Sequence, residues 1–271
     1  MSTWGNKWAL VTGASAGIGR ALAIELAGGG THLILTARRR DRLEDLAAHI
    51  RSLRDVRIEL FPFDLARPNA PDEIFAFTKG QGIDLDLLVN NAGFGAYGDF
   101  YRADLARHLE MIQVNISAVV HLTRLYLPRM VERRRGDILI LASTAAFQAV
   151  PFITTYAATK AFDLLFGEGL AEEVRTYGVR VCVLCPGSTI TEFHAVAGQP
   201  KRTQRRQETP EKVARSGLRA LAAGKSVVIS GAANAYRRRR SASSRAAQSR
   251  ALRPRCFVLA NSSDHRCKLS C

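Results

Sequence analysis

The segment Tyr156-Ala-Ala-Thr-Lys160 places a phenol and an ammonium group on one face of a helix, if the segment is helical. A phenol has an ordinary pKa of about 10, and a nearby ammonium lowers that pKa by favouring the phenolate. Ser143, upstream in the chain, adds a hydroxyl that can hydrogen-bond a substrate oxygen. Together the three side chains can hold a carbonyl group and exchange a proton with its oxygen.

A glycine-rich turn near the N-terminus offers a place for a cofactor. Gly13, Gly17 and Gly19 follow an apolar run at 8–11 and precede a helical pattern. In such a turn, backbone N–H groups can approach a pyrophosphate at the positive end of the helix. The spacing G-x-x-x-G-x-G departs from the commoner G-x-G-x-x-G, so a simple strand-to-helix turn is the alternative. Two further residues of the turn are predicted to contact the cofactor, Ser15 and Ile18.

The end of the second strand indicates which dinucleotide is bound. An acidic residue at this place would bind the adenosine ribose of NAD, whereas this chain has Arg38, Arg39 and Arg40. Arg38 can meet a 2′-phosphate with charge-assisted hydrogen bonds, assisted by Arg39 or Ser15. We therefore expect NADP(H) to be preferred over NAD(H). The alternative is that the arginines only solvate the turn, which is the interpretation we favour for Arg40.

The chain alternates apolar strand-like runs with longer helical patterns. The expected strands lie near residues 7–12, 32–36, 56–62, 85–90, 136–142, 179–185 and 226–230. The expected helices lie near 17–29, 40–53, 70–80, 103–131, 153–176 and 210–223. This order predicts an α/β protein: a single Rossmann-like doubly wound domain over 1–233, with a seven-stranded, mostly parallel sheet and helices on both faces. We expect a substrate lid at about 190–224.

The motifs resemble, in their order, those of the short-chain dehydrogenase/reductase family. The resemblance covers about residues 5–231 and rests on Thr12-Gly13-x-x-x-Gly17-x-Gly19, Asp64, Asn90-Asn91-Ala92-Gly93, Asn115, Ser143, Tyr156-x-x-x-Lys160 and Pro186-Gly187 before Thr189 and Thr191. It implies an oxidoreductase that interconverts a ketone or aldehyde and an alcohol by hydride transfer.

The resemblance also implies roles for single residues. Asn115, Ser143, Tyr156 and Lys160 would form the catalytic group, with Asn115 distorting its helix and holding a water that leads to Lys160. The other implied contacts are Asp64 at the adenine, Lys160 at the nicotinamide ribose, Asn91, Ala92 and Gly93 beside the cofactor, Pro186, Gly187, Thr189 and Thr191 at the nicotinamide side, and Leu65 and Tyr156 as further cofactor contacts. From the residues alone, Asp64 could instead cap its loop, 90–93 could be only a turn, and Asn115 could be an ordinary polar helix residue.

The substrate is less well specified. We expect Phe94, Ser143, Phe152 and Phe193 to contact it, which favours an apolar substrate body. The basic stretch at 201–206 could steer an anionic substrate, although a solvated lid loop is the simpler interpretation. We hypothesise NADPH-dependent carbonyl reduction. One alternative is a 3-oxoacyl-type reductase for acyl thioesters or acyl conjugates, and the other is a non-catalytic NADP-binding regulatory protein.

Composition argues against several other classes of protein. Five cysteines do not make a disulfide scaffold, and Cys182 and Cys185 would point to opposite faces of one strand, so we infer no metal site. The charge-free segment at 138–159 contains too many polar residues to span a membrane. The N-terminus lacks a signal-peptide pattern, which predicts a cytoplasmic protein. Apolar residues on the helices at 103–131 and 153–176 predict, with the resemblance, a homodimer or homotetramer.

The C-terminal extension at 234–271 departs from the family pattern. Residues 237–271 contain nine Arg, one Lys and one acid, which is +9 of the net charge of +15. This segment is a disordered solvated extension, a basic arm for nucleic acid or anionic lipid, or the product of a shifted reading frame or non-native end. We favour the first or third explanation and expect no nucleic acid partner, because no aromatic residues alternate with the basic ones.

Overall fold

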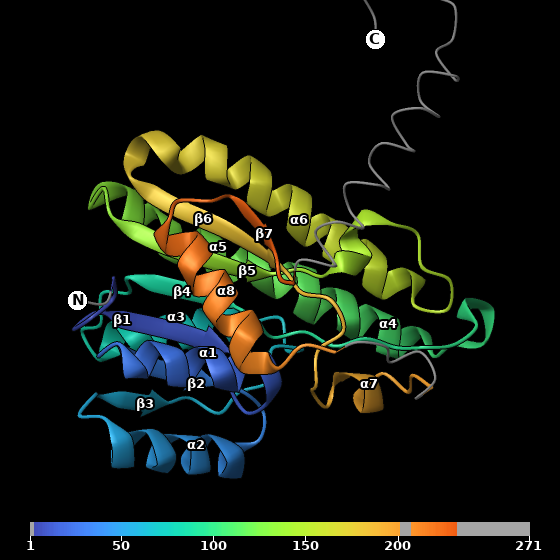
Figure 1. Cartoon of the computed structure of the whole chain (residues 1–271), viewed down its shortest axis with the longest axis horizontal. Coiled ribbons are helices and arrows are strands. Elements are labelled where there is room, and N and C mark those ends of the chain that lie inside the picture. Colours follow the sequence, from blue (N-terminus) through green and yellow to red (C-terminus); the bar gives the residue numbers. More distant parts are fainter. Residues whose placement is uncertain (1–2, 201–206, 232–271) are drawn as a thin grey trace, which may run out of the picture. The chain divides into compact units, whose positions relative to one another are not determined.

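The computed structural model describes residues 3–200 and 207–231, shown in colour in Figure 1. The basic stretch at 201–206 and the C-terminal extension at 234–271 lie outside the described residues, so the predictions made for them stay predictions.

A seven-stranded parallel sheet forms the centre of the described chain. Its strand order is β3-β2-β1-β4-β5-β6-β7. The strands are β1 (Trp8–Thr12), β2 (His32–Thr36), β3 (Ile58–Leu60), β4 (Leu87–Asn90), β5 (Gly136–Leu141), β6 (Val179–Cys185) and β7 (Val227–Ile229). The strand order reverses between β1 and β4. In an open parallel sheet, a crevice forms at such a point outside the carboxyl ends of the strands.

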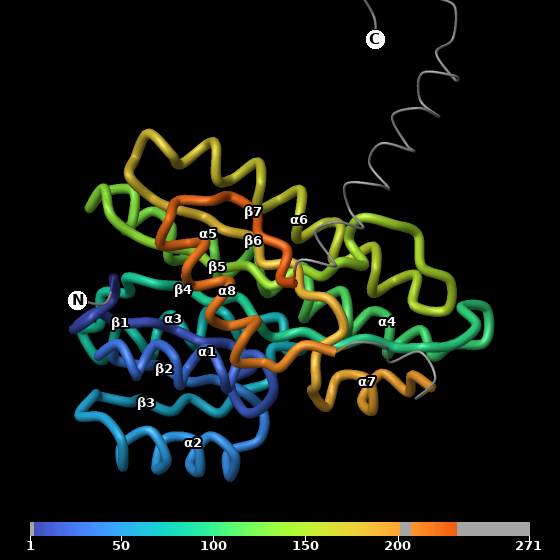
Figure 2. Tube along the Cα trace, in the orientation of Figure 1, coloured from blue at the N-terminus to red at the C-terminus, as the bar shows by residue number. Residues whose placement is uncertain are grey.

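Helices cover both faces of this sheet, as Figures 1 and 2 show. They are α1 (Gly17–Gly28), α2 (Arg40–Leu53), α3 (Ala70–Gly80), α4 (Leu105–Ile112), α5 (Ala118–Glu132), α6 (Thr154–Val174), α7 (Phe193–Val196) and α8 (Pro210–Ala222). Apolar residues of α1, α2 and α8 form one core with the sheet, and those of α3, α4, α5 and α6 form the core on the other face. The predicted doubly wound fold is therefore confirmed.

Two predicted segments differ from the structure. The single helix expected at 103–131 is α4 and α5, joined by a π-helical turn at Gln113–Ser117 that contains Asn115. Such turns insert an extra residue into a helix and often mark functional sites. The lid expected at about 190–224 includes α8, which instead packs into the core through Val213, Ala214 and Leu221. Thr209 caps α8, since its side chain accepts a hydrogen bond from the N–H of Lys212.

The charge-free segment at 138–159 runs through most of β5, the following turn and the first residues of α6. Among residues 3–200 and 207–231, no helix has the length and apolar character that a membrane crossing requires.

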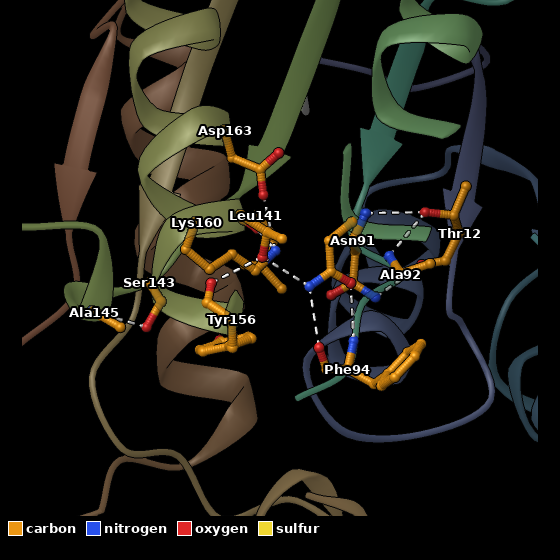
Figure 3. A network of polar contacts seen from close by, with 12 residues as sticks. Thr12, Asn91, Ala92, Phe94, Leu141, Ser143, Ala145, Tyr156, Lys160 and Asp163 are labelled. Carbon is orange, nitrogen blue, oxygen red and sulfur yellow. Dashed lines mark hydrogen bonds and ion pairs between the residues drawn. The ribbon is translucent and has the colours of Figure 1, made fainter. Parts of the chain in front are cut away.

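Thr12 fastens the end of β1 to the end of β4. Its Oγ1 donates to the carbonyl of Val89 at 3.2 Å and accepts from the N–H groups of Asn91 and Ala92, both at 2.9 Å. The Asn91 side chain returns a hydrogen bond to the Thr12 carbonyl at 2.8 Å. Figure 3 shows the contacts of Thr12 with Asn91 and Ala92. Because Thr12 is 1% exposed, these bonds are shielded from water, and they set the distance between the glycine turn and the chain after β4.

Replacing Thr12 by Val removes the hydroxyl at nearly constant volume, so the buried N–H of Asn91 and the part-buried N–H of Ala92 both lose this acceptor. We expect the free energy of unfolding to fall by about 1–3 kcal/mol, the cost of an unsatisfied buried group. Urea denaturation measures the change. Thr12→Ser retains the hydroxyl and is the matched control, so equal losses in both variants would show that the methyl group, not the hydrogen bonds, is responsible.

Candidate active site

A cavity of about 310 Å³ lies along the glycine turn at the carboxyl ends of the strands. The residues that bound it include most of the cofactor contacts expected from the sequence: Gly13, Ser15, Gly17, Ile18, Gly19, Arg38, Arg39, Asp64, Leu65, Asn91, Ala92, Gly93 and Thr191, with Phe94 and Phe193.

A second cavity, of about 260 Å³, contains the expected proton-transfer group. It is bounded by Ser143, Tyr156, Lys160, Pro186, Gly187 and Thr189. The two cavities adjoin, because both are bounded by Ile18, Asn91, Gly93, Leu141, Thr191 and Phe193. The structure thus brings the phenol, the ammonium and the hydroxyl into a crevice that is continuous with the glycine turn.

The glycines of the turn are required by its geometry. Gly13 and Gly17 have φ values of +66° and +54°, a left-handed conformation that residues with a Cβ rarely adopt. A Cβ at Gly19 would collide with the carbonyl oxygen of Gly13 and the side-chain nitrogen of Asn91. Glycine is therefore required here for the left-handed backbone and for the close packing of the turn against Asn91, and all three glycines bound the cavity in which a pyrophosphate would lie.

Two arginines lie at the end of the cavity beyond the glycine turn. Arg39 pairs with Glu192 at 2.9 Å and donates to the Ser15 hydroxyl at 3.3 Å. Arg38 lies 3.6 Å from Glu110 and keeps 57% of its side chain exposed. Both guanidinium groups are positioned where a phosphate on the adenosine ribose could meet them. Arg40 does not bound either cavity and pairs with Glu44 one helical turn away, at 3.7 Å.

The loop-capping role considered for Asp64 is present, since its carboxylate accepts from the N–H of Ala66 at 3.0 Å. Asp64 also bounds the first cavity, so the cap and a cofactor contact are compatible.

Asn115 is fully buried behind Gly93 and bounds neither cavity. Its Oδ1 accepts from the N–H of Phe94 at 3.1 Å, and its Nδ2 donates to the Phe94 carbonyl and to the Thr159 hydroxyl, both at 3.0 Å. A Cβ at Gly93 would lie 3.1 Å from Asn115 Oδ1 and 3.4 Å from Lys160 Nζ. The π-helical turn thus joins the chain after β4 to helix α6, next to the lysine.

Lys160 projects from α6 into a largely dry environment, with 5% of its side chain exposed. Its ammonium donates to the Leu141 carbonyl at 2.7 Å and to Asp163 Oδ2 at 2.9 Å, as Figure 3 shows. The ammonium nitrogen is 6.0 Å from the centre of the Tyr156 ring. Ser143 Oγ accepts from the N–H of Ala145 at 3.1 Å, and its hydroxyl hydrogen-bonds the Tyr156 phenol, which works to lower the pKa of that phenol.

Burial and charge act in opposite directions on Tyr156 and Lys160. Burial raises the pKa of Tyr156, and the opposing effects of Lys160 and Ser143 are smaller, so the net pKa is above its ordinary value. Lys160 thus works to lower the pKa of Tyr156, as the sequence predicts, but burial has the larger effect and the net shift is upward. Burial is the largest effect on Lys160 and works to lower its pKa, but the charge and hydrogen bond of Asp163, with the charges of Tyr156 and Cys185, together outweigh it and leave that pKa raised.

Phe152 does not bound either cavity. Its side chain is 52% exposed, and its ring lies 5.8 Å from that of Tyr97. Phe152 is one of few described residues other than glycine that have a positive φ, here +66°, which is an uncommon backbone conformation for a bulky residue. The structure therefore gives no support to Phe152 as a substrate contact. Phe94 and Phe193 do bound the crevice, and the Phe193 ring packs 4.9 Å from that of Tyr156.

Sequence reasoning missed two polar features. One is Asp163, which its position three residues after Lys160 on a helix could have indicated. The other is a chain of contacts at the second cavity, in which His194 meets the Ser188 hydroxyl at 3.1 Å and Gln199 Oε1 at 2.5 Å. No group of three potential metal ligands is found within residues 3–200 and 207–231.

Known proteins resemble this chain in sequence and in structure. The family model described as short chain dehydrogenase matches residues 7–202. A 7beta-hydroxysteroid dehydrogenase from Clostridium sardiniense is 35% identical over 186 residues, which is 69% of this chain and 70% of that protein. A very-long-chain 3-oxoacyl-CoA reductase from Danio rerio is 36% identical over 193 residues, and the match covers 69% of this chain but only 60% of the reductase.

A solved structure gives the same result for the fold. The short-chain dehydrogenase from Sphingobium yanoikuyae, in complex with NADPH, superposes with a TM-score of 0.82 at 28% identity, covering 96% of this chain and 99% of that one. Fold, crevice, motifs and relatives agree, and we conclude that the chain belongs to the short-chain dehydrogenase/reductase family of oxidoreductases.

Proposed function

We propose that the protein is an NADP(H)-dependent oxidoreductase that interconverts a carbonyl compound and an alcohol, with Tyr156 as the general acid and base. The observation that carries this proposal is that Ser143, Tyr156 and Lys160 bound one cavity that is continuous with the glycine turn and its arginines. A proton-transfer group and a dinucleotide cradle in one crevice are the two parts that such a reaction needs.

Each side chain has a distinct task in the reaction. Ser143, which lies in hydrogen-bond contact with Tyr156, donates to the substrate oxygen when substrate binds and fixes that oxygen beside the phenol. In reduction the phenol of Tyr156 gives its proton to the oxygen, and in oxidation the phenolate removes the proton again. The Lys160 ammonium stabilises the phenolate in both directions. NADP(H), when bound, supplies or accepts the hydride. Asn115 acts indirectly, because it positions Gly93 and Thr159 next to Lys160.

Preference for NADP(H) follows from charge at the end of β2. Arg38 and Arg39 bound the cavity there, and the place of the acidic residue that would accept the ribose hydroxyls of NAD is taken by arginine. The NADPH complex of the Sphingobium yanoikuyae relative supports this assignment.

The substrate we propose is a ketone or aldehyde with an apolar body. Phe94, Val150, Ile153 and Phe193 contribute apolar surface to the crevice. The relatives are named for hydroxysteroids and very-long-chain 3-oxoacyl thioesters, whose apolar bodies fit this lining. A 3-oxoacyl-type reductase is therefore the second candidate. A non-catalytic NADP-binding protein is the weaker alternative, since the catalytic residue types are all present.

We also propose that the protein forms a homodimer or homotetramer through α4 and α6. The two helices contact each other and expose Leu105, Leu109 and Leu165 by 66%, 56% and 69% of their surface. Adjacent exposed leucines of this size favour an interface, because apolar area gains free energy on burial.

Tyr156→Phe removes the exchangeable proton and keeps the ring that packs on Phe193. We expect turnover of any carbonyl substrate to fall by at least about 10²-fold, the usual contribution of general acid catalysis, with NADPH affinity retained. NADPH oxidation with a panel of ketones, sugars, steroids and 3-oxoacyl derivatives measures the first quantity and fluorescence titration the second. Wild-type-like turnover in the variant would contradict the assigned role, and a wild-type protein without turnover would favour the non-catalytic alternative.

Replacing Arg38 or Arg39 by Ala removes a cationic partner of the 2′-phosphate. We expect KM for NADPH to rise about tenfold or more, while KM for NADH changes little, because a hydrogen bond to a charged group contributes about 1.5–3 kcal/mol. Steady-state kinetics with both cofactors provide the comparison. Arg40→Ala is the matched control and should leave both values unchanged. A strong preference of the wild-type enzyme for NADH would count against the assignment.

Leu165→Glu, or Leu109→Glu, places a charge in the proposed interface. We expect sedimentation velocity at micromolar concentration to show a dimer or tetramer for the wild type and smaller species for these variants. Leu53→Glu, at a comparably exposed leucine on α2, should leave the assembly intact. A monomeric wild type would rule the interface out.

A further inference from the structure

Asp163 forms an ion pair in the interior of the protein, on the catalytic helix. Its Oδ2 accepts from Lys160 Nζ at 2.9 Å, and the two side chains are 0% and 5% exposed. Removing two charges from water costs free energy that their mutual attraction does not always recover. Replacing Asp163 alone by an apolar residue would leave the buried Lys160 ammonium without its charged partner, which is strongly destabilising. The carboxylate at this position is therefore explained by the lysine with which it pairs.

The second oxygen of Asp163 strengthens this argument. Oδ1 is buried and has no hydrogen-bond partner among the described residues, so half of the carboxylate is unsatisfied. A charged group that is buried with an unpaired oxygen is costly, and within residues 3–200 and 207–231 the side chain that hydrogen-bonds it is the lysine of the proton-transfer group. Among the described residues, the interaction that offsets the cost of burying this carboxylate is the one with Lys160 Nζ.

The contacts of that atom define what Asp163 can do. An ammonium has three N–H donors. One is given to the Leu141 carbonyl at the end of β5 and one to Asp163. Two acceptors on different elements fix the position of the nitrogen and leave one donor for the crevice, which Lys160 bounds.

We propose that Asp163 is a positioning residue for the reaction: it fixes the Lys160 ammonium beside Tyr156 and, through its own negative charge, sets the pH range in which the phenol exchanges its proton. This inference rests on the function proposed above.

The direction of the effect follows from the charges around the phenol. Lys160 favours the phenolate, whereas Asp163 on the same helix opposes it. The thiol of Cys185 on β6 also acts on both Tyr156 and Lys160, but only when it is ionised. Ser143, from the turn after β5, is the remaining side chain that shifts the phenol. Asp163 opposes the phenolate, so removing its charge lowers the pH at which Tyr156 loses its proton while Lys160 stays charged. If Lys160 lost its proton first, the phenolate midpoint would not fall, and the proposal would be refuted.

The test is the pH dependence of kcat/KM for alcohol oxidation, which rises as the phenol ionises. Asp163→Asn removes the charge and keeps an oxygen that can accept from Lys160. Asp163→Ser does the same with a smaller side chain, in case the amide is not tolerated. We expect the midpoint of the rise to move to lower pH by about one unit in these variants, with a lower plateau because Lys160 is less firmly placed. Glu172→Gln neutralises an exposed acid on the same helix and is the matched control.

A purely structural Asp163 would give a different result. In that case Asp163→Asn and Asp163→Ser would lower stability or the plateau, and the midpoint would stay at the wild-type pH, which would overturn the proposal. A shift of equal size in Glu172→Gln would overturn it too, because the effect would then be one of net charge.

A second measurement separates this inference from the proposed function. Absorbance titration of the phenolate, taken as the difference between each protein and its Tyr156→Phe counterpart, needs no substrate. A lower midpoint in Asp163→Asn supports the inference even if no carbonyl compound is turned over. An unchanged midpoint refutes it even if Tyr156 proves essential for turnover.

Discussion

A buried ammonium group is the constraint on which the site depends. Lys160 has little access to water, so its charge must be stabilised by fixed partners, and the Leu141 carbonyl and Asp163 provide them. Leu141 ends β5, and Asp163 lies on α6, so the position of the charge is set by the packing of that helix on the sheet. The chemistry of Tyr156 follows from where this cation is placed. Burial also affects Tyr156 more strongly than Lys160 does, so the pKa of the phenol is shifted upward.

The cofactor side of the crevice is tied to this charge through the chain after β4. Thr12 holds Asn91 and Ala92 against the glycine turn, and Asn115 holds Phe94 against the π-helical turn. Gly93 lies between them, close to both Asn115 and Lys160. A short segment of backbone therefore connects the pyrophosphate cradle to the proton-transfer group. A short connection of this kind holds the cofactor site and the proton-transfer group in a fixed relative orientation, and such orientation lowers the barrier of a reaction.

Much of this arrangement could be predicted from the sequence. Buried parallel strands are continuous apolar runs, and six helical patterns separate them, so the sheet and its covering helices followed from periodicity. The spacing of Tyr156 and Lys160, and the glycines of the turn, indicated which residues would meet at the carboxyl ends of the strands. The Arg38 and Arg39 pair was found from its place after β2. The proposed chemical roles of these residues are still to be tested.

Other features could not be predicted, for physical reasons. The π-helical turn around Asn115 depends on hydrogen bonds to Phe94 and Thr159, which are distant in the sequence. Phe152 looked like a pocket residue by type, but its positive φ directs it to Tyr97. The burial of Asp163 depends on how α6 packs on the sheet, which the sequence alone does not show. The most direct test of the account is a single turnover with NADPH that carries deuterium at the transferable position of the nicotinamide. We predict that the deuterium appears on the carbinol carbon of the product alcohol, and that Tyr156→Phe suppresses this transfer. Loss of the label to solvent, or equal transfer by the variant, would contradict it.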